Sequence, residues 1–132
     1  MNEIFKITKD EKRANALIEM ARNRYKNMNF KEPYRIIEEY YEIIKELITS
    51  FMYKQGWKTL SHKSLIEFAS ENIKILSSIE ISLIDELRIK RNNIVYYGEQ
   101  VSLDFLRSRE TTIRSIIDKL FTIVKDFDIS LV

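Results

Sequence analysis

Glycine and proline are rare in this chain: 132 residues contain two glycines, Gly56 and Gly98, and one proline, Pro33. A fold that reverses direction often needs residues that tolerate positive φ or that fix a turn. The scarcity of both residue types therefore disfavours a turn-rich all-β or α/β architecture. It predicts a small number of long elements joined by short connections.

Apolar residues recur at helical spacing along the chain, which predicts five amphipathic helices. The apolar stripes run over residues 14–28, 37–51, 65–76, 84–95 and 106–127. No internal repeat, low-complexity tract or Ser/Gly/Pro-rich linker divides the chain. The sequence therefore predicts one all-α domain over residues 1–132, an antiparallel bundle of four to five helices.

Residues typical of helix ends suggest where the elements begin and stop. Capping boxes, in which Ser or Thr is followed three residues later by Glu, are predicted at Thr8, Ser64 and Ser77. Pro33 is tolerated in a first turn, so the second helix is expected to begin there. Gly56 and Gly98 suit left-handed caps at the ends of the second and fourth helices. The third helix is expected over about 64–76, and the fifth from near Ser102.

The amino-acid composition excludes several kinds of covalent, catalytic and metal-binding site. Cysteine is absent and His62 is the single histidine, so a disulfide framework and a thiol nucleophile are excluded, and a multi-histidine metal centre has little to build on. We expect no metal and no cofactor. The net charge of +2 neither requires nor forbids a nucleic acid as a binding partner.

No apolar run approaches the roughly 20 residues of a membrane span, and the first residues lack a secretory pattern. A cytoplasmic location without membrane contact is expected.

Arg88 and Arg91 interrupt the apolar stripe of the fourth helix. A guanidinium cannot lose its charge, so on a half-buried face it needs a carboxylate, carbonyl groups or a bound anion. Two interpretations stay open. The arginines pair with an acid or extend to solvent, or they hold a phosphate group. The acids considered for the first interpretation are Glu38, Glu42 and Asp85.

The residues around Arg91 give weight to the phosphate interpretation. Three cations and two amides fall within less than two turns, and two tyrosines follow before Gly98. Such a surface can contact phosphates and stack on bases. The residues concerned are Arg88, Lys90, Arg91, Asn92, Asn93, Tyr96 and Tyr97. The basic clusters at 9–13 and 22–26, in contrast, fit the solvated face of an amphipathic helix.

The segment RNNIVYYG at 91–98 resembles the signature of the HEPN superfamily, an Arg-Asn pair followed by a few residues and usually a His. A second segment, GWKTLSHKSL at 56–65, is similar to the link between the second and third helices of that family, in which a Gly, a variable stretch, a His and a Leu lead into the next helix. The helix pair before the link matches too. The resemblance therefore spans nearly the whole chain.

This resemblance implies a helical bundle that forms a homodimer, with the Arg and His of both motif helices in a shared cleft. Many members are metal-independent RNases, often toxins whose antitoxin partner is a small nucleotidyltransferase, and others bind nucleotides or are noncatalytic. Arg91 then takes the place of the signature arginine and Asn92 that of the polar residue after it. Tyr96 stands where the histidine is expected.

The replacement of that histidine bears on catalysis. A phenol with a reference pKa of about 10 is ionised in roughly one molecule per thousand at pH 7, which makes Tyr96 a poor general base unless nearby cations lower its pKa. His62 could supply a base instead. A lone histidine at the start of a short helix, however, commonly makes a polar contact, and the resemblance places His62 in the link. We expect a structural role for it.

Three functions follow from these observations. The first is a noncatalytic or weakly active module that binds RNA or a nucleotide through Arg88, Lys90, Arg91 and Tyr97, in a toxin–antitoxin type of system. The second is a metal-independent endoribonuclease that uses Arg91, Asn92 and Tyr96. The third is a protein-interaction partner of a nucleotidyltransferase. A homodimer is expected, because polar side chains on an apolar stripe set the register when two identical helices meet.

Overall fold

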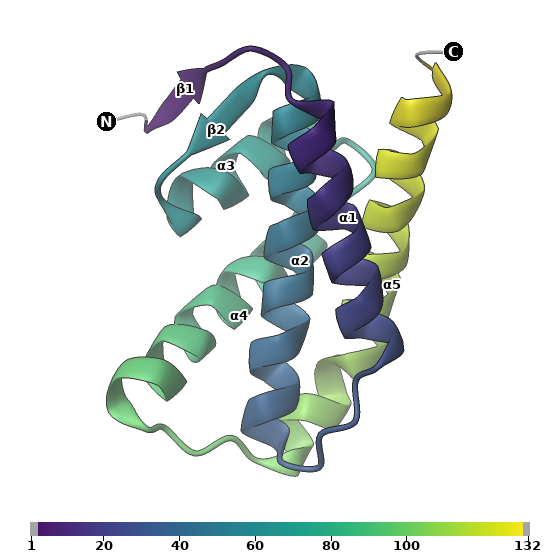
Figure 1. Ribbon diagram of the computed structural model, residues 1–132. Coiled ribbons are helices and arrows are strands. Elements are labelled where there is room, and N and C mark those ends of the chain that lie inside the picture. The colour runs from purple at the N-terminus through teal and green to yellow at the C-terminus, as the bar shows by residue number, and fades with distance from the viewer. Residues whose placement is uncertain (1–2, 131–132) are drawn as a thin grey trace.

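The computed structural model describes the backbone of residues 3–130 and the side chains of residues 3–125. This part of the chain forms five helices and a two-stranded sheet (Figure 1), which confirms the predicted all-α bundle. The elements are β1 Ile4–Lys6, α1 Glu11–Lys26, α2 Pro33–Gln55, β2 Trp57–Thr59, α3 His62–Asn72, α4 Ser78–Tyr97 and α5 Leu103–Ser130. Phe127, in the predicted stripe of the last helix, lies outside the described side chains.

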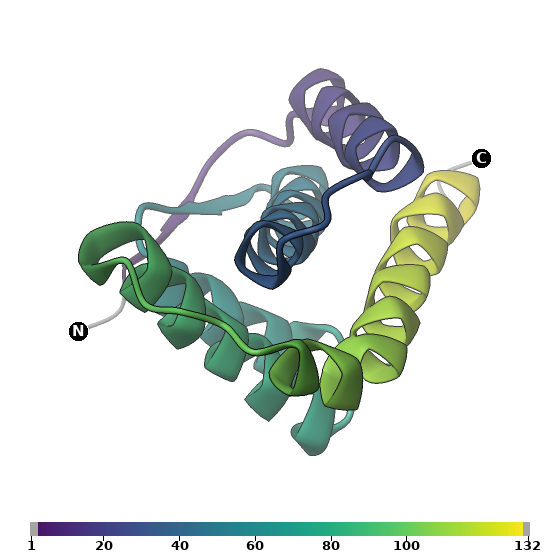
Figure 2. The same cartoon turned by 90° about the horizontal axis from the view of Figure 1, so that it is seen from below.

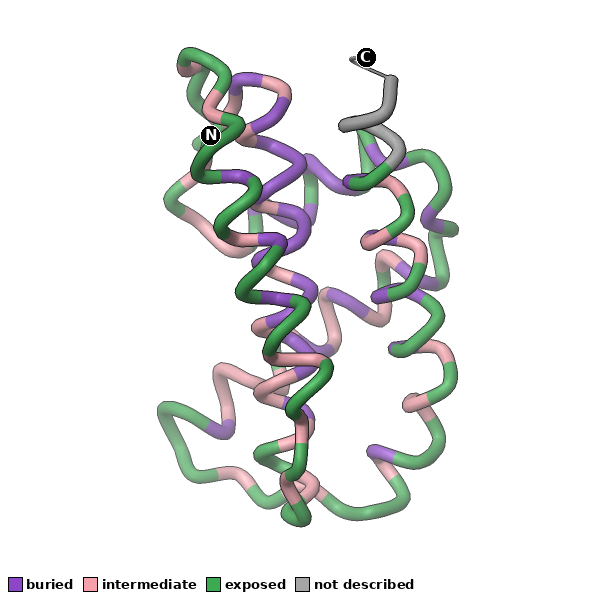
Figure 3. The backbone as a smooth tube through the Cα atoms, turned by 45° about the vertical axis from the view of Figure 1, so that its right-hand side comes forward, coloured by how far each residue is buried: buried purple, intermediate pink, exposed green. Residues whose placement is uncertain are grey.

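The helix α2 is the centre of the bundle. A view along it shows α1, α5 and the pair α3 and α4 arranged around it (Figure 2). Its side chains are apolar on several faces, and Tyr40, Ile44 and Ile48 are completely buried. A helix that is apolar nearly all round is stable only when other elements cover it. The buried residues of the bundle accordingly follow α2 and the inward sides of its neighbours (Figure 3).

The ends of α2 and α4 lie where the sequence predicts them. Pro33 is the first residue of α2, and Gly56 caps its end with φ at 84°. The capping box of α4 is formed by Ser77 and Glu80, and Gly98 caps its end with φ at 64°. These residues begin or end their helices through local geometry, so their pattern in the sequence is sufficient to identify both helices.

The predicted starts of α1 and α3 are wrong. Asp10, and not Thr8, caps α1 through a hydrogen bond from the backbone N of Arg13 to its carboxylate. Thr8 follows Ile7, whose backbone N donates to the carbonyl of Gly56 and so holds this segment beside the end of α2. In α3 the cap is Ser61, and the helix ends at Asn72, four residues before the predicted end. Ser64 lies within the first turn and is buried.

The sheet of β1 and β2 is an addition to the predicted bundle. Its antiparallel register pairs Ile4 with Thr59 and Lys6 with Trp57. Strands of three residues are too short to show a period-two pattern, so the sequence gives no sign of them. The sheet ties the start of the chain to the segment that leads into α3. None of the described helices is long and apolar enough to cross a membrane.

Candidate functional site

Arg88 extends from α4 and is largely buried, with 19% of its side chain exposed. Its Nε donates to Oδ1 of Asp85 at 2.8 Å, one turn earlier in the same helix. Asp85 is one of the three acids considered from the sequence. The charge of Arg88 is therefore balanced within α4, although the Asp85 side chain is 43% exposed and the pair is open to water on that side.

Arg91 is half-buried on the same helix and lacks such a partner. Within the described side chains no carboxylate oxygen lies within 4.0 Å of its guanidinium. Its Nη1 contacts Oδ1 of Asn92 at 3.4 Å, which is long for a hydrogen bond. Arg91 thus carries a charge that its neighbours in the fold do not pair.

A pocket of about 340 Å³ opens beside Arg91. It is lined by Arg24, Phe30, Arg35, Glu38, Glu39, Glu42 and Arg91. Two of its arginines are already engaged. Arg24 donates to Glu39 at 2.9 Å and to Glu46 at 3.1 Å, and Arg35 lies 4.3 Å above the ring of Phe30. Arg91 is therefore the pocket cation that remains available to a ligand, and the carboxylates of Glu38 and Glu42 line the same pocket.

His62 and Tyr41 form a second polar feature near the arginines. A hydrogen bond of 3.0 Å joins the Tyr41 hydroxyl to Nδ1 of His62, and the two rings stack with centroids 5.7 Å apart. Tyr41 comes from the buried face of α2, and His62 is the first residue of α3. The contact therefore joins two helices and fixes the orientation of the imidazole.

The electrostatic environment of this pair includes both arginines of α4. Burial lowers the pKa of His62 below its usual value, and Lys45, Arg91 and Arg88 lower it further, while Glu42 opposes them. Burial raises the pKa of Tyr41 to about 12, although Arg88 and Arg91 oppose this shift. At pH 7 both partners are therefore neutral, and they lie close enough to the arginines for the two sets of groups to influence one another.

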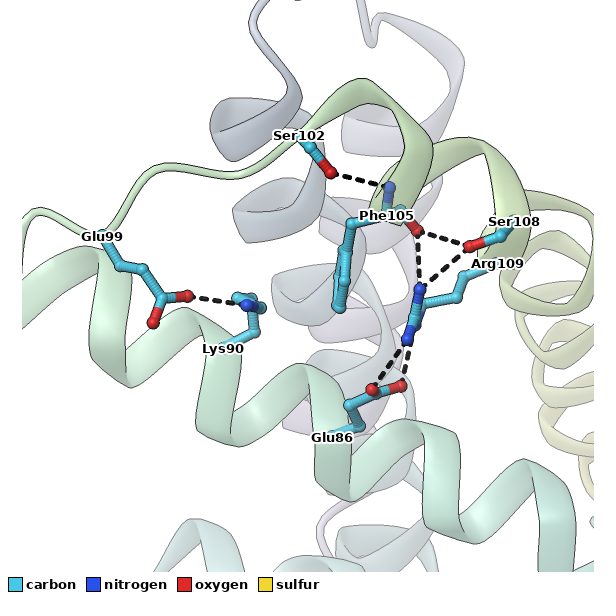
Figure 4. Close-up of polar contacts among 7 residues, drawn as sticks. All are labelled: Glu86, Lys90, Glu99, Ser102, Phe105, Ser108 and Arg109. Atoms are coloured by element: carbon cyan, nitrogen blue, oxygen red, sulfur yellow. Dashed lines mark hydrogen bonds and ion pairs between the residues drawn. The ribbon is translucent and has the colours of Figure 1, made fainter.

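Lys90 faces α5 and belongs to a different cluster from Arg91. Its Nζ donates to Oε2 of Glu99 at 2.7 Å and lies 4.6 Å from the centre of the Phe105 ring. Arg109 covers the other side of that ring at 3.8 Å and donates twice to Glu86, at 2.9 and 3.0 Å (Figure 4). The Lys90 ammonium therefore holds the connection between α4 and α5 together.

The remaining predicted site residues lie at the end of α4. Tyr96 and Tyr97 are 69% and 82% exposed. Asn92 is half-buried beside Arg91, whereas Asn93 donates to Glu99 on the side of Lys90. The structure therefore brings together Arg88, Arg91 and Asn92, leaves the two tyrosines on the surface nearby, and separates Lys90 from them. No group of three or more His, Asp or Glu side chains in the described part of the chain could hold a metal ion.

His62 is the residue whose surroundings sequence reasoning missed. The polar contact expected for it is present, but the partner lies 21 residues away on α2 and the neighbouring cations come from α4. Such contacts depend on how helices cross. The one signal available in the sequence was that His62 and the arginines are the unusual polar groups of an otherwise regular bundle.

No protein-family model matches the chain, and no curated protein or solved structure is significantly similar to it. The resemblance to the HEPN superfamily therefore stays a prediction based on the two sequence segments.

Proposed function

We propose that this chain is a HEPN-like module that binds the phosphate group of RNA or of a nucleotide at Arg91, with no cleavage activity or a weak one. The observation that carries the proposal is the half-buried guanidinium of Arg91, for which the described side chains supply no carboxylate within 4.0 Å. A phosphate offers two oxygens in the geometry that a guanidinium fork binds. A bound phosphate would thus supply the negative charge that the described side chains do not place beside Arg91.

The surroundings of Arg91 indicate how such a ligand would lie. Glu38 and Glu42 line the pocket and repel a polyanion, so a single phosphate at Arg91 fits better than a strand laid through the pocket. Tyr96 and Tyr97 offer exposed rings within two turns of Arg91, on which bases can stack. This arrangement favours a nucleotide or one exposed segment of RNA.

Exposed side chains of α4 support the proposed homodimer. Apolar and aromatic side chains are exposed there, although a monomer in water gains nothing from exposing them. They are Ile89, Val95, Tyr96 and Tyr97. A second copy that covers these side chains would remove them from water. Light scattering over micromolar concentrations tests this part of the proposal, and a monomer throughout that range would contradict it.

The binding proposal is tested with a fluorescent single-stranded RNA in excess chelator. Arg91→Ala should weaken binding by about tenfold or more, because a hydrogen-bonded charge contributes about 1.5–3 kcal/mol. Arg107→Ala is the matched control. Arg107 is exposed on α5, has no ion pair with the described side chains, and its loss changes the net charge equally. We expect less than about a twofold effect, since surface charge acts mainly through long-range attraction.

Three other results would contradict the binding proposal. Equal loss of affinity in both variants would show that binding depends on net charge and not on a site at Arg91. Multiple-turnover cleavage of the RNA by the native chain, lost in Arg91→Ala and Tyr96→Phe, would identify an endoribonuclease and not a module with weak activity. Absence of binding to RNA and nucleotides would direct the search to a protein partner such as a nucleotidyltransferase.

A further inference from the structure

Glu38 is a half-buried carboxylate that lines the pocket described above. No Lys, Arg or His side chain in the described part of the chain lies within 4.0 Å of it. The other two glutamates of the pocket are engaged. Glu39 accepts a hydrogen bond from Arg24 at 2.9 Å, and Glu42 forms an ion pair with Lys45 at 2.5 Å. Glu38 is therefore the pocket carboxylate that remains available to a ligand.

Arg91 and Glu38 have opposite charges and line the same pocket without forming an ion pair with each other. Arg91 comes from α4, and Glu38 comes from the second turn of α2. A ligand that contacts both needs an anionic group for the guanidinium and hydrogen-bond donors for the carboxylate, because an ionised carboxylate only accepts. A nucleotide has both, since its phosphate is the anion and its base carries donors.

The pocket also contains a surface on which a base can stack. It is formed by Phe30, in the connection between α1 and α2, and by Arg35 of α2. The Arg35 guanidinium lies 4.3 Å from the centre of the Phe30 ring. Bases stack on aromatic rings and on guanidinium planes. Arg35 and Glu38 are three residues apart and so lie on the same face of α2, which brings a carboxylate near the edge of a base stacked there.

The size and charge of the pocket fit a single nucleotide. Its volume of about 340 Å³ is near the lower end of the range for small-molecule sites. Three arginines and three glutamates line it, so their formal charges cancel. No excess of positive charge is left for a second phosphate, whereas an uncharged base meets no penalty from the net charge of the pocket.

We propose that this pocket selects guanine nucleotides, with the phosphate at Arg91 and the Watson–Crick edge of the base at Glu38. This inference rests on the proposed function and names its class of ligand. Guanine has two neighbouring donors on that edge, the N1–H and the 2-amino group, which match the two oxygens of a carboxylate. Adenine and cytosine have an acceptor beside their amino group, and uracil has one donor between two carbonyl oxygens. Each of these bases would place an acceptor against the carboxylate.

The experiment is isothermal titration calorimetry of the native chain with the 5′-monophosphates of guanosine, inosine and adenosine (GMP, IMP and AMP). GMP and IMP differ only by the 2-amino group, and AMP carries the same ribose phosphate with an acceptor at N1. GMP should bind about tenfold more tightly than either, because a hydrogen bond to a charged group contributes about that factor.

Variants separate recognition of the base from recognition of the phosphate. Glu38→Gln should weaken GMP binding by about tenfold and leave AMP binding no weaker, so that the preference is lost. Glu71→Gln is the matched control and should keep the preference. Glu71 is exposed on α3, lies outside this pocket and has no ion pair with the described side chains. Arg91→Ala should weaken GMP and AMP by the same factor, since both carry the phosphate.

The outcomes distinguish this inference from the binding proposal. If nucleotides or RNA bind in an Arg91-dependent manner without a preference for GMP, guanine selection is overturned and the proposed function stands. A preference for GMP that persists in Glu38→Gln overturns the role of Glu38. If neither nucleotides nor RNA bind, both proposals fail. A preference for GMP over IMP and AMP that is lost in Glu38→Gln and kept in Glu71→Gln supports the inference.

Discussion

The Tyr41 hydroxyl and Nδ1 of His62 lie 3.0 Å apart, joining the buried face of α2 to the first residue of α3. Burial keeps the Tyr41 phenol neutral, with its pKa raised to about 12. Burial and the cations around it keep His62 neutral as well at pH 7. The hydrogen bond is therefore one between neutral groups, and its loss is expected to affect stability without creating an unpaired charge.

Replacement of Tyr41 by Phe should lower the free energy of unfolding by about 1 kcal/mol, the usual net contribution of one such hydrogen bond. Urea denaturation measures the change, with an unaltered m-value showing that the folded and unfolded states keep their compactness. Tyr34→Phe is the control, because Tyr34 is exposed on the same helix. Equal effects of the two replacements would contradict a specific contribution of the contact.

Stability should depend on pH through His62. Because its pKa in the folded state is below the usual value of 6.5, the unfolded chain binds more protons in the interval between the two values. The free energy of unfolding should therefore decrease as the pH falls from about 6.5 through the folded pKa. His62→Gln should remove this part of the dependence. Glu46, whose pKa is raised by burial, acts in the opposite sense, so the informative quantity is the difference between the two proteins.

Two of the three arginines that line the pocket, Arg91 and Arg24, should respond differently to replacement by Met. Arg91→Met removes a half-buried charge without a carboxylate partner among the described side chains, so we expect a change within about 0.5 kcal/mol or a gain in stability. Arg24→Met leaves Glu46, which is 4% exposed, without its cation and should cost about 3 kcal/mol. Thermal and urea unfolding measure both. A large loss in Arg91→Met would show that the fold pairs this charge after all.

Gly56 and Gly98 provide a comparison of two left-handed caps. Alanine at either position must adopt positive φ, which costs roughly 1–2 kcal/mol. At Gly56 the new Cβ would also lie 2.9 Å from the carbonyl oxygen of Ile7, whereas nothing lies within 4 Å at Gly98. Gly56→Ala should therefore be the more destabilising, by roughly another 1 kcal/mol or more. Equal losses in urea unfolding would show that the backbone of Ile7 shifts without cost.

Local patterns and long-range contacts account for what the sequence did and did not predict. The ends of α2 and α4 follow from Pro33, Gly56, Ser77 and Gly98, because these residues act within one turn. The start of α1 was missed because Ile7 is tied to Gly56 across the molecule, which no spacing along the chain expresses. Arg91 stood out as a charge on an apolar stripe. The neighbourhood of His62 required the crossing of α2, α3 and α4, which amphipathic periodicity does not specify.

The two capped ends of α4 have a consequence for ligand binding. The reciprocal hydrogen bonds of Ser77 and Glu80 fix its first turn, and Gly98 with Glu99 satisfies the carbonyls of its last. The helix that carries Arg91 is thus ordered before any ligand arrives, and the entropy of ordering its backbone is lost during folding. Because the helix is preorganised, none of the interaction energy of a bound phosphate is used to order it, and that energy contributes to affinity. A small ligand can therefore bind without an extensive interface.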